Sequence, residues 1–278
     1  MQSTNRKWQH HLRSKGIMGF FLDRLQSHAL TSAWQYGNGP FDFPIDDAEL
    51  DDELSRAYFE FTEQFPYELY IELTNHCNLE CVMCARPKMT RPLGIMSEEL
   101  FKKIIDEIAE KQPFAYIHYY GIGESLLDKK VFDKLAYARE KGLNNSVLFT
   151  NGQILLEKDN YKRLADAGLS TIGVDLDGVR AQTYEKIRVG GSFEKAKQGI
   201  VRLHEYLDTK PDISTRVDIS FHIYKDVNEM DVEPFIEWCE AGGYEYTVVT
   251  MHTWAGLRDD IPESGVDGVP AMHRNARR

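Results

Sequence analysis

Three of the four cysteines of this 278-residue chain lie close together, at Cys77, Cys81 and Cys84. Their spacing is C-x3-C-x2-C. A disulfide would use two of these thiols and leave the third over, so the group favours a metal ion or an iron–sulfur cluster. A structural zinc site closes with four ligands, whereas a four-iron cluster held by three cysteines leaves one iron open for a further ligand. The residues alone therefore leave an iron–sulfur cluster, a zinc site and unrelated thiols open.

The fourth cysteine, Cys239, belongs to a different pattern. It shares one helical face with Val232, Phe235 and Ile236. A thiol in such a position behaves as a small apolar side chain. We expect a buried structural residue rather than a fourth ligand.

The cysteines must be positioned by the elements around them, and these alternate regularly. The stretch at 68–73 alternates as a strand does and leads directly into the cysteine segment. Further strands are expected at 114–120, 145–149, 171–176, 216–224 and 246–251, with helices at 100–108, 131–139, 161–167, 193–207 and 232–239. Alternation of this kind predicts a parallel sheet in an α/β fold, with functional sites at the carboxyl ends of the strands.

The cysteine segment resembles the signature of the radical S-adenosylmethionine (SAM) superfamily. The spacing matches, and Met83 supplies the apolar residue before the last cysteine. The resemblance covers about residues 65–255. It implies a partial (βα)6 TIM-like barrel, a [4Fe-4S] cluster on Cys77, Cys81 and Cys84, and SAM as the second cofactor.

The second strand is followed by Gly121-Ile122-Gly123-Glu124. Alone, this stretch is typical of a plain turn. After the cysteine segment it resembles the family's Gly-Gly-Glu motif, which binds the methionine amino group of SAM. Ile122 stands where the family has its first paired glycine, and Ser125 where it has proline. The resemblance implies that Gly121, Gly123 and Glu124 bind SAM.

The third and fourth strands also end in polar residues. Asn151 belongs to a Thr-Asn-Gly step that lies beside SAM in the family, although Asn-Gly is also an ordinary turn. Asp175 takes the place of the serine in the family's Ser-x-Asp-Gly pattern. In the family the residue at this place reaches the ribose or the carboxylate of SAM. An aspartate accepts hydrogen bonds from ribose hydroxyls but would repel the carboxylate, so the resemblance implies that Asp175 binds the ribose. Asp177 is expected to cap the next turn.

Two further residues are implied in SAM binding by the resemblance. Arg188 lies in a stretch similar to the family's Ile-Arg-x-Gly-x-Phe, and its guanidinium suits the SAM carboxylate. An arginine packed on Glu185 or Asp177 is the alternative. Met251, at the end of the sixth strand, lies where the family holds adenine.

Candidate substrate-contacting residues come from alternating positions on two strands. His118 and Tyr120 share one face of the second strand, and His222 and Tyr224 share one face of the fifth. A lone histidine is more often a core residue, so each is only a candidate. If these faces point inward, the cavity is polar, which favours a sugar-like or aminocyclitol small molecule or a peptide as substrate.

The two ends of the chain have a different character from the barrel. Residues 1–66 predict a helical extension, with an acidic run near residues 46–53 that starts a solvated helix or binds a basic partner. Residues 256–278 have no hydrophobic period and predict a flexible tail or a shortened linker. The domain boundaries expected are therefore 1–66, 67–255 and 256–278.

The barrel motifs look closest to the branch with a C-terminal SPASM domain, whose second cysteine set has no counterpart after Cys239.

Composition limits which classes of partner and which cell compartment are expected for the protein. The net charge is −11, which disfavours nucleic acid and anionic membrane as partners. The longest apolar run near the N-terminus, residues 16–22, is too short to span a bilayer. Clustered cysteines suggest a reducing compartment, so a cytoplasmic protein is expected.

The resemblance implies reductive cleavage of SAM to a 5′-deoxyadenosyl radical, which takes a hydrogen atom from a substrate. It further implies an electron donor such as flavodoxin or ferredoxin. The alternative is a non-catalytic, metal- or cluster-binding scaffold that recognises a partner on an inherited barrel. Cleavage of SAM separates the two hypotheses, because a scaffold needs none.

Overall fold

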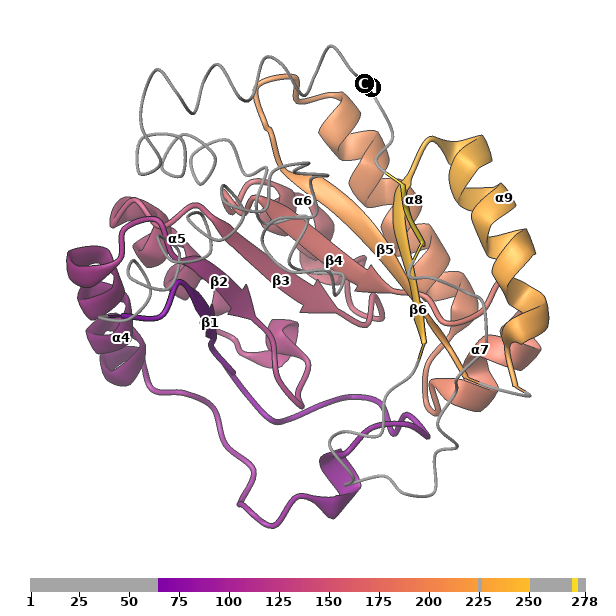
Figure 1. Ribbon diagram of the computed structural model, residues 1–278, viewed down its shortest axis with the longest axis horizontal. Coiled ribbons are helices and arrows are strands. Elements are labelled where there is room, and N and C mark those ends of the chain that lie inside the picture. Colours follow the sequence, from indigo (N-terminus) through magenta and orange to yellow (C-terminus); the bar gives the residue numbers. More distant parts are fainter. Residues whose placement is uncertain (1–64, 225–226, 251–271, 275–278) are drawn as a thin grey trace, which may run out of the picture.

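The computed structural model describes residues 65–224, 227–250 and 272–274. One sheet carries parallel strands in chain order, followed by one antiparallel edge strand (Figure 1). The parallel strands are β1 (Glu68–Tyr70), β2 (Tyr116–Tyr119), β3 (Ser146–Thr150), β4 (Thr171–Asp175), β5 (Arg216–Ile223) and β6 (Glu245–Thr250). β7 (Met272–Arg274) pairs antiparallel with β6. The arrangement confirms the α/β partial barrel, and β7 is a strand that the sequence did not predict.

Helices connect the strands and cover one side of the sheet. They are α4 (Glu98–Lys111), α5 (Val131–Glu140), α6 (Asn160–Ala165), α7 (Ala181–Ile187), α8 (Phe193–Asp208) and α9 (Val232–Gly242). Ser97 caps α4 by accepting a hydrogen bond from the Leu100 amide at 3.1 Å. α7 was not predicted as a helix, because its seven residues are too short for a clear hydrophobic period.

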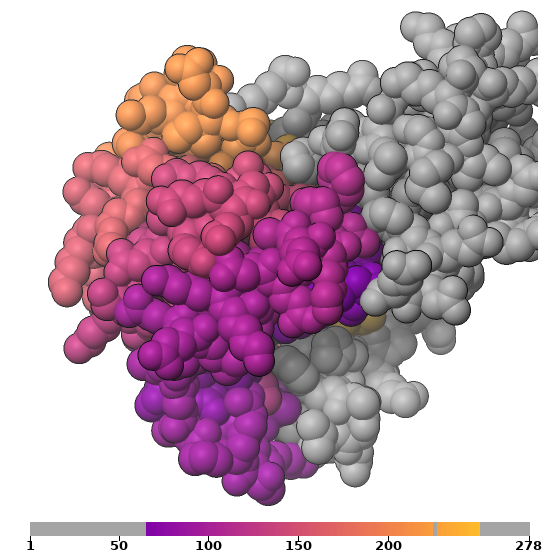
Figure 2. Space-filling view, turned by 90° about the vertical axis from the view of Figure 1, so that its left-hand side faces the viewer, coloured from indigo at the N-terminus to yellow at the C-terminus, as the bar shows by residue number. Residues whose placement is uncertain are grey.

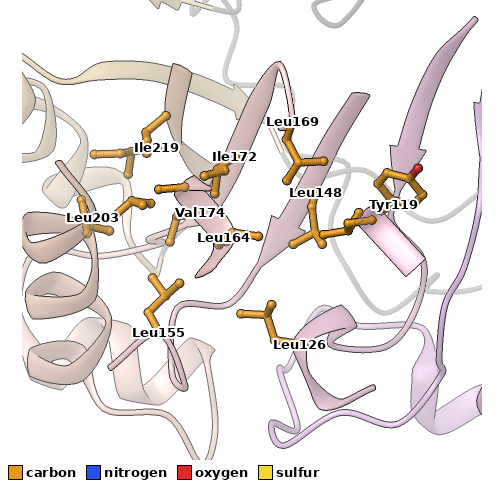
Figure 3. Close-up of a cluster of buried hydrophobic side chains, with 14 of the residues drawn as sticks. Tyr119, Leu126, Leu148, Leu155, Leu164, Leu169, Ile172, Val174, Leu203 and Ile219 are labelled. Carbon is orange, nitrogen blue, oxygen red and sulfur yellow. The ribbon is translucent and has the colours of Figure 1, made fainter. Parts of the chain in front are cut away.

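The core lies between the sheet and these helices. Figure 3 shows Leu148, Ile172 and Ile219 from neighbouring strands together with Leu203 of α8. All four side chains are fully buried. Since successive strand residues point to opposite faces, the alternate positions lie on the other side of the sheet, where polar residues such as Asp218 predominate.

The long segment between β1 and α4 leaves the sheet before the chain returns. In Figure 1 it runs in purple along the lower edge of the molecule. Figure 2 shows the side where this segment, α4 and α5 form one continuous surface. The backbone of the segment is anchored near both ends, because the Met96 amide donates to the Leu73 carbonyl at 2.8 Å and the Asn75 amide donates to Gly94 at 3.2 Å.

Several sequence predictions concern residues beyond this description. The helical extension at 1–66 lies outside the described residues except for its last two positions, and so do Met251 and most of 256–278. These predictions stay predictions. In the part of the chain that is described, no helix combines the length and apolar character needed to cross a membrane.

Candidate functional site

A cavity lies where the cysteine segment faces the carboxyl ends of the strands. It brings together residues from positions 77 to 222, and all three clustered cysteines line it. The predicted site residues that line it are Cys77, Cys81, Cys84, Tyr120, Gly121, Gly123, Glu124, Asn151, Asp175, Arg188 and His222. Met83, Ile122, Phe149 and Thr150 complete the wall. Residues far apart in sequence therefore converge on one place, as expected for a site at strand ends.

Two of the predicted substrate-contacting residues, His118 and Tyr224, are not among the residues that line this cavity. His118 is buried deeper in β2, with Nε2 2.7 Å from Glu68 Oε1 and its ring stacked on Tyr70 at 4.2 Å. Tyr224 follows the end of β5, where its amide donates to Asn228 Oδ1 at 2.6 Å. Its side chain packs against the apolar cluster of Leu79, Met83 and Ile187 in and beside the cysteine segment.

The cysteine segment is held by α7 and the residues after it. The Val82 amide donates to the Ile187 carbonyl, and the Glu80 amide to the Val189 carbonyl, both at 2.9 Å. Leu79, Met83 and Ile187 form a small buried apolar cluster at the same contact. A loop with these backbone and apolar contacts is preformed, so the three thiols do not have to be gathered when a cofactor binds.

Gly121 and Gly123 allow the second strand end to approach the cysteine segment. A Cβ on Gly123 would lie 2.1 Å from the Thr74 carbonyl oxygen, and one on Gly121 would meet the Glu72 side chain. The Glu124 amide donates to the His76 carbonyl at 2.8 Å. The glycines are therefore required by contact with the chain that leads to Cys77, in addition to lining the cavity.

Glu124 presents a buried carboxylate at the cavity. It accepts hydrogen bonds from the Leu126 amide at 3.2 Å, from Thr150 Oγ1 at 2.8 Å and from the Asn151 amide at 2.7 Å. Burial raises the pKa of Glu124 to about 7, against the lowering effect of these donors. A cationic group in the cavity would favour the ionised form, so Glu124 suits an ammonium ligand.

Arg188 is a buried cation held by two aspartates. Its Nε donates to Asp177 Oδ2 at 2.6 Å, and Nη2 lies 3.2 Å from Asp175 Oδ2. Desolvation opposes ionisation of Asp177, but Arg188 and then His222 hold the pKa of that carboxyl at about 2. Asp177 thus does more than cap a turn, and it occupies the guanidinium edge that was expected to bind the SAM carboxylate. Any contact from Arg188 to SAM is left to Nη1.

His222 joins the same network from β5. Its amide and its Nδ1 both lie near Asp177 Oδ1, at 2.9 and 3.1 Å. Burial alone would lower the pKa of His222, but the adjacent Asp177 carboxylate raises it above the ordinary value. Asn228 completes the arrangement by donating to the carbonyls of Asp177 and His222.

The three thiols suit a soft metal cluster. Burial raises the pKa of Cys77, and that of Cys81 to about 11, so both are neutral until a metal displaces their protons. Within the described residues, no three His, Cys, Asp or Glu side chains close around one point as they would around a single metal ion. Thiolates are soft ligands of the kind that iron–sulfur clusters and zinc both take.

Comparison with known proteins decides the family. Residues 71–239 match the model of the Radical SAM superfamily, which is more than half of the chain. The chain belongs to the radical SAM superfamily. The superfamily consists of enzymes, and a [4Fe-4S] cluster and SAM are its cofactors. The cavity carries groups of the kind that both cofactors need, because three thiols and the buried Glu124 carboxylate line it together.

Individual relatives match part of this chain and are longer than the region that matches. The tungsten-containing aldehyde ferredoxin oxidoreductase cofactor-modifying protein of Pyrococcus furiosus is 32% identical over 58% of this chain and 46% of its own length. The Fe-coproporphyrin III synthase of Methanosarcina barkeri is 36% identical over 48% of this chain and 33% of its own. The chain thus spans less than half of these radical SAM relatives.

Solved structures support the fold of this radical SAM chain. The structure of Streptococcus suis SuiB bound to precursor peptide SuiA superposes with a TM-score of 0.58 at 15% identity. It covers 88% of this chain and 54% of that one. At this identity the likeness is one of fold.

The structure also shows where Cys239 lies, and it reveals several residues that the sequence analysis did not single out. Cys239 is fully buried in the main core beside the helices, which confirms the structural role predicted for it. Thr150 belongs to the Thr-Asn-Gly step but was not singled out as a site residue, and Asn228 had no signal beyond being a polar residue in a loop. Phe149 was treated only as part of β3, yet its place on the alternate face of that strand could have indicated the cavity.

Proposed function

We propose that this chain is the catalytic barrel of a radical SAM enzyme that abstracts a hydrogen atom from a polar substrate. The observation that carries the proposal is the single cavity that joins Cys77, Cys81 and Cys84 to the SAM-binding candidates of β2, β3 and β4. A reduced cluster bound there supplies the electron that cleaves SAM to methionine and a 5′-deoxyadenosyl radical, which removes hydrogen from substrate.

The chain's own residues bind and orient SAM in this proposal. Glu124 accepts from its ammonium group, and the Gly121–Gly123 backbone forms the adjacent wall. Asp175, one of whose oxygens already faces Arg188, accepts from the ribose hydroxyls. Asn151 lies between Glu124 and Cys77 and contacts SAM at that end of the cavity. Met251 is proposed near adenine on sequence grounds alone.

A polar substrate is favoured by the face of the sheet that the cavity adjoins. Tyr120, Asp175 and His222 line the cavity from three different strand ends. Below them on the same face, Asp218 accepts from Thr247 Oγ1 at 2.9 Å and from Ser220 Oγ at 3.3 Å. Such a surface suits a sugar, an aminocyclitol or a peptide side chain better than a hydrocarbon. Flavodoxin or ferredoxin is the proposed class of electron donor.

The test of the function is anaerobic reconstitution with iron and sulfide, followed by dithionite and SAM. We expect a brown protein that forms 5′-deoxyadenosine, measured by mass spectrometry. A protein that binds a cluster and SAM but never cleaves SAM would favour the scaffold alternative.

Cys81→Ala and Cys239→Ala form a matched pair, since each removes one buried thiol. We expect Cys81→Ala to lose nearly all bound iron, because three ligands are reduced to two. Cys239→Ala should keep wild-type iron, because its thiol lies in the apolar core. Full iron and sulfide in Cys81→Ala would refute the ligand assignment.

Glu124→Gln tests the SAM ammonium site separately from the cluster. We expect SAM to bind about tenfold or more weakly, because a charge-assisted hydrogen bond is replaced by a neutral one. Equilibrium dialysis measures SAM binding, and the iron content should stay at the wild-type level. Unchanged SAM affinity would remove Glu124 from the site.

A further inference from the structure

Each of the three clustered cysteine sulfurs has an N–H group directed at it. The Arg86 amide donates to Cys84 Sγ at 3.4 Å. Asn151 Nδ2 donates to Cys77 Sγ at 3.8 Å, and Arg188 Nη1 donates to Cys81 Sγ at 3.9 Å. The first donor is local backbone, but the other two are side chains from distant parts of the barrel.

The Asn151 amide is fixed by contacts on both of its polar atoms. Nδ2 also donates to Asn78 Oδ1 at 2.9 Å, and Oδ1 accepts from the Gln153 amide at 3.0 Å. The Asn151 backbone amide is bound to Glu124 at 2.7 Å. Since Nδ2 carries two hydrogens, one can serve Asn78 while the other points at Cys77. Asn151 is therefore held for this contact rather than reaching it by chance.

Arg188 is fixed in the same sense by its carboxylate partners. Asp177 binds Nε and Nη2, and Asp175 lies against Nη2. The remaining nitrogen, Nη1, is the one directed at Cys81. The side chain is only 8% exposed, so the positive charge acts on the sulfur in a poorly screened setting.

We propose that Asn151 and Arg188 are positioning residues that raise the reduction potential of the cluster through N–H···S hydrogen bonds to Cys77 and Cys81. The inference rests on the proposed function, because it requires the cluster on these thiolates. Reduction adds negative charge that spreads onto the sulfurs, and hydrogen bonds to sulfur stabilise that charge. Both residues would then ease electron entry before SAM is cleaved, besides any contact they make with SAM.

The test is an anaerobic redox titration of the reconstituted protein without SAM, followed by EPR of the reduced cluster. Omitting SAM separates the contacts to sulfur from contacts to the cosubstrate. Asn151→Leu keeps the size of the side chain but removes the N–H group. At the wild-type midpoint, we expect the ratio of reduced to oxidised cluster to fall about threefold, as suits one neutral hydrogen bond.

The Arg188 variants test the charged contact. Arg188→Gln should lower the same ratio by about tenfold or more, and a tenfold change is about 59 mV for a one-electron couple. Arg188→Lys should recover part of the loss, because it restores the charge without the planar fork. Tyr120→Phe is the control, since it removes a hydroxyl from the same cavity wall without removing an N–H group.

The outcomes separate this inference from the proposed function. Lowered potentials in Asn151→Leu and Arg188→Gln, with Tyr120→Phe at the wild-type value, support it. A normal cluster with unchanged potential in Asn151→Leu overturns the role of Asn151 while the proposed function stands. If the Arg188 variants do not assemble a cluster, Asn151→Leu alone decides. Failure of the wild-type chain to bind any cluster overturns both proposals.

Discussion

The two faces of the sheet differ sharply in the side chains that they carry. On β5, Ile219 and Phe221 point toward the helices and are fully buried among apolar side chains. Their neighbours Asp218, Ser220 and His222 point to the other side and contact polar partners. The same strand therefore contributes stability on one face and carries the groups available for chemistry on the other.

The polar face is buried almost as deeply, so its charges need partners. Asp177 is fully buried, and the side chain of Arg188 is 8% exposed. Removal of charges from water is unfavourable unless they are paired and hydrogen-bonded. The network of Asp175, Asp177, Arg188 and His222 satisfies that requirement with residues from three segments. Consequently a substitution on the polar face must keep the charges and hydrogen bonds, whereas a substitution on the helix-facing side must keep the side-chain volume.

Phe221→Ala and Ser220→Ala test the comparison most strongly, because the two residues are adjacent and face opposite sides. Phe221 contacts the Phe235 ring at 4.9 Å, and its loss leaves a cavity that should cost about 3–5 kcal/mol of unfolding free energy. Ser220→Ala should cost about 1 kcal/mol, because Asp218 keeps its bond from Thr247. Urea denaturation of the apoprotein measures both, and equal costs would break the distinction between the faces.

Asp177→Asn and Asp128→Asn compare a buried ion pair at the cavity with one away from it. Asp128 pairs with Lys134 at 2.6 Å, and both side chains are almost fully buried. Each variant should lower the unfolding free energy by about 3 kcal/mol, because a buried cation loses its charged partner. For Asp177, the remaining Asp175 limits the loss.

Only the cavity variant should also change cofactor binding. We expect Asp177→Asn to weaken SAM binding several-fold, because Arg188 is no longer held in place, whereas Asp128→Asn should bind SAM normally. Equilibrium dialysis on reconstituted protein measures this. Equal SAM affinity in the two variants would mean that the Asp177 network is structural only.

The sequence was sufficient to predict the structural features that repeat along the chain or that depend on a local residue pattern. The parallel strands were placed to within a few residues because alternation and turn signals mark their ends, as at Ser146–Thr150. The cysteine spacing and the Gly-x-Gly-Glu stretch identified residues that do line one cavity. β7 was missed, since three residues in a polar stretch carry too little pattern to predict a strand.

What could not be predicted depends on contacts between distant segments. Asp177 and Asn228 are 51 positions apart, and nothing local shows that one binds the other. His118 and Tyr120 alternate as predicted, but their depth along β2 decides that Tyr120 lines the cavity and His118 instead pairs with Glu68. Likewise, the partners of Arg188 follow from where α7 ends relative to β4, which a strand pattern does not specify.

The smallest expected effect is on how folding stability depends on pH, and we expect it from a titratable pair on the polar face. Because Asp177 raises the pKa of His222, the charged imidazolium stabilises the folded state. This contribution is fully present below the ordinary histidine pKa of about 6.5 and is lost as pH rises through the folded-state value. The melting temperature of the apoprotein should therefore fall more steeply above pH 6.5 in the wild type than in His222→Gln. In an Asp177→Asn background the two slopes should come closer together, because the carboxylate that raises the pKa of His222 most is gone and only Asp175 remains. Parallel slopes for wild type and His222→Gln with Asp177 intact would show that the His222–Asp177 pair does not couple protonation to folding.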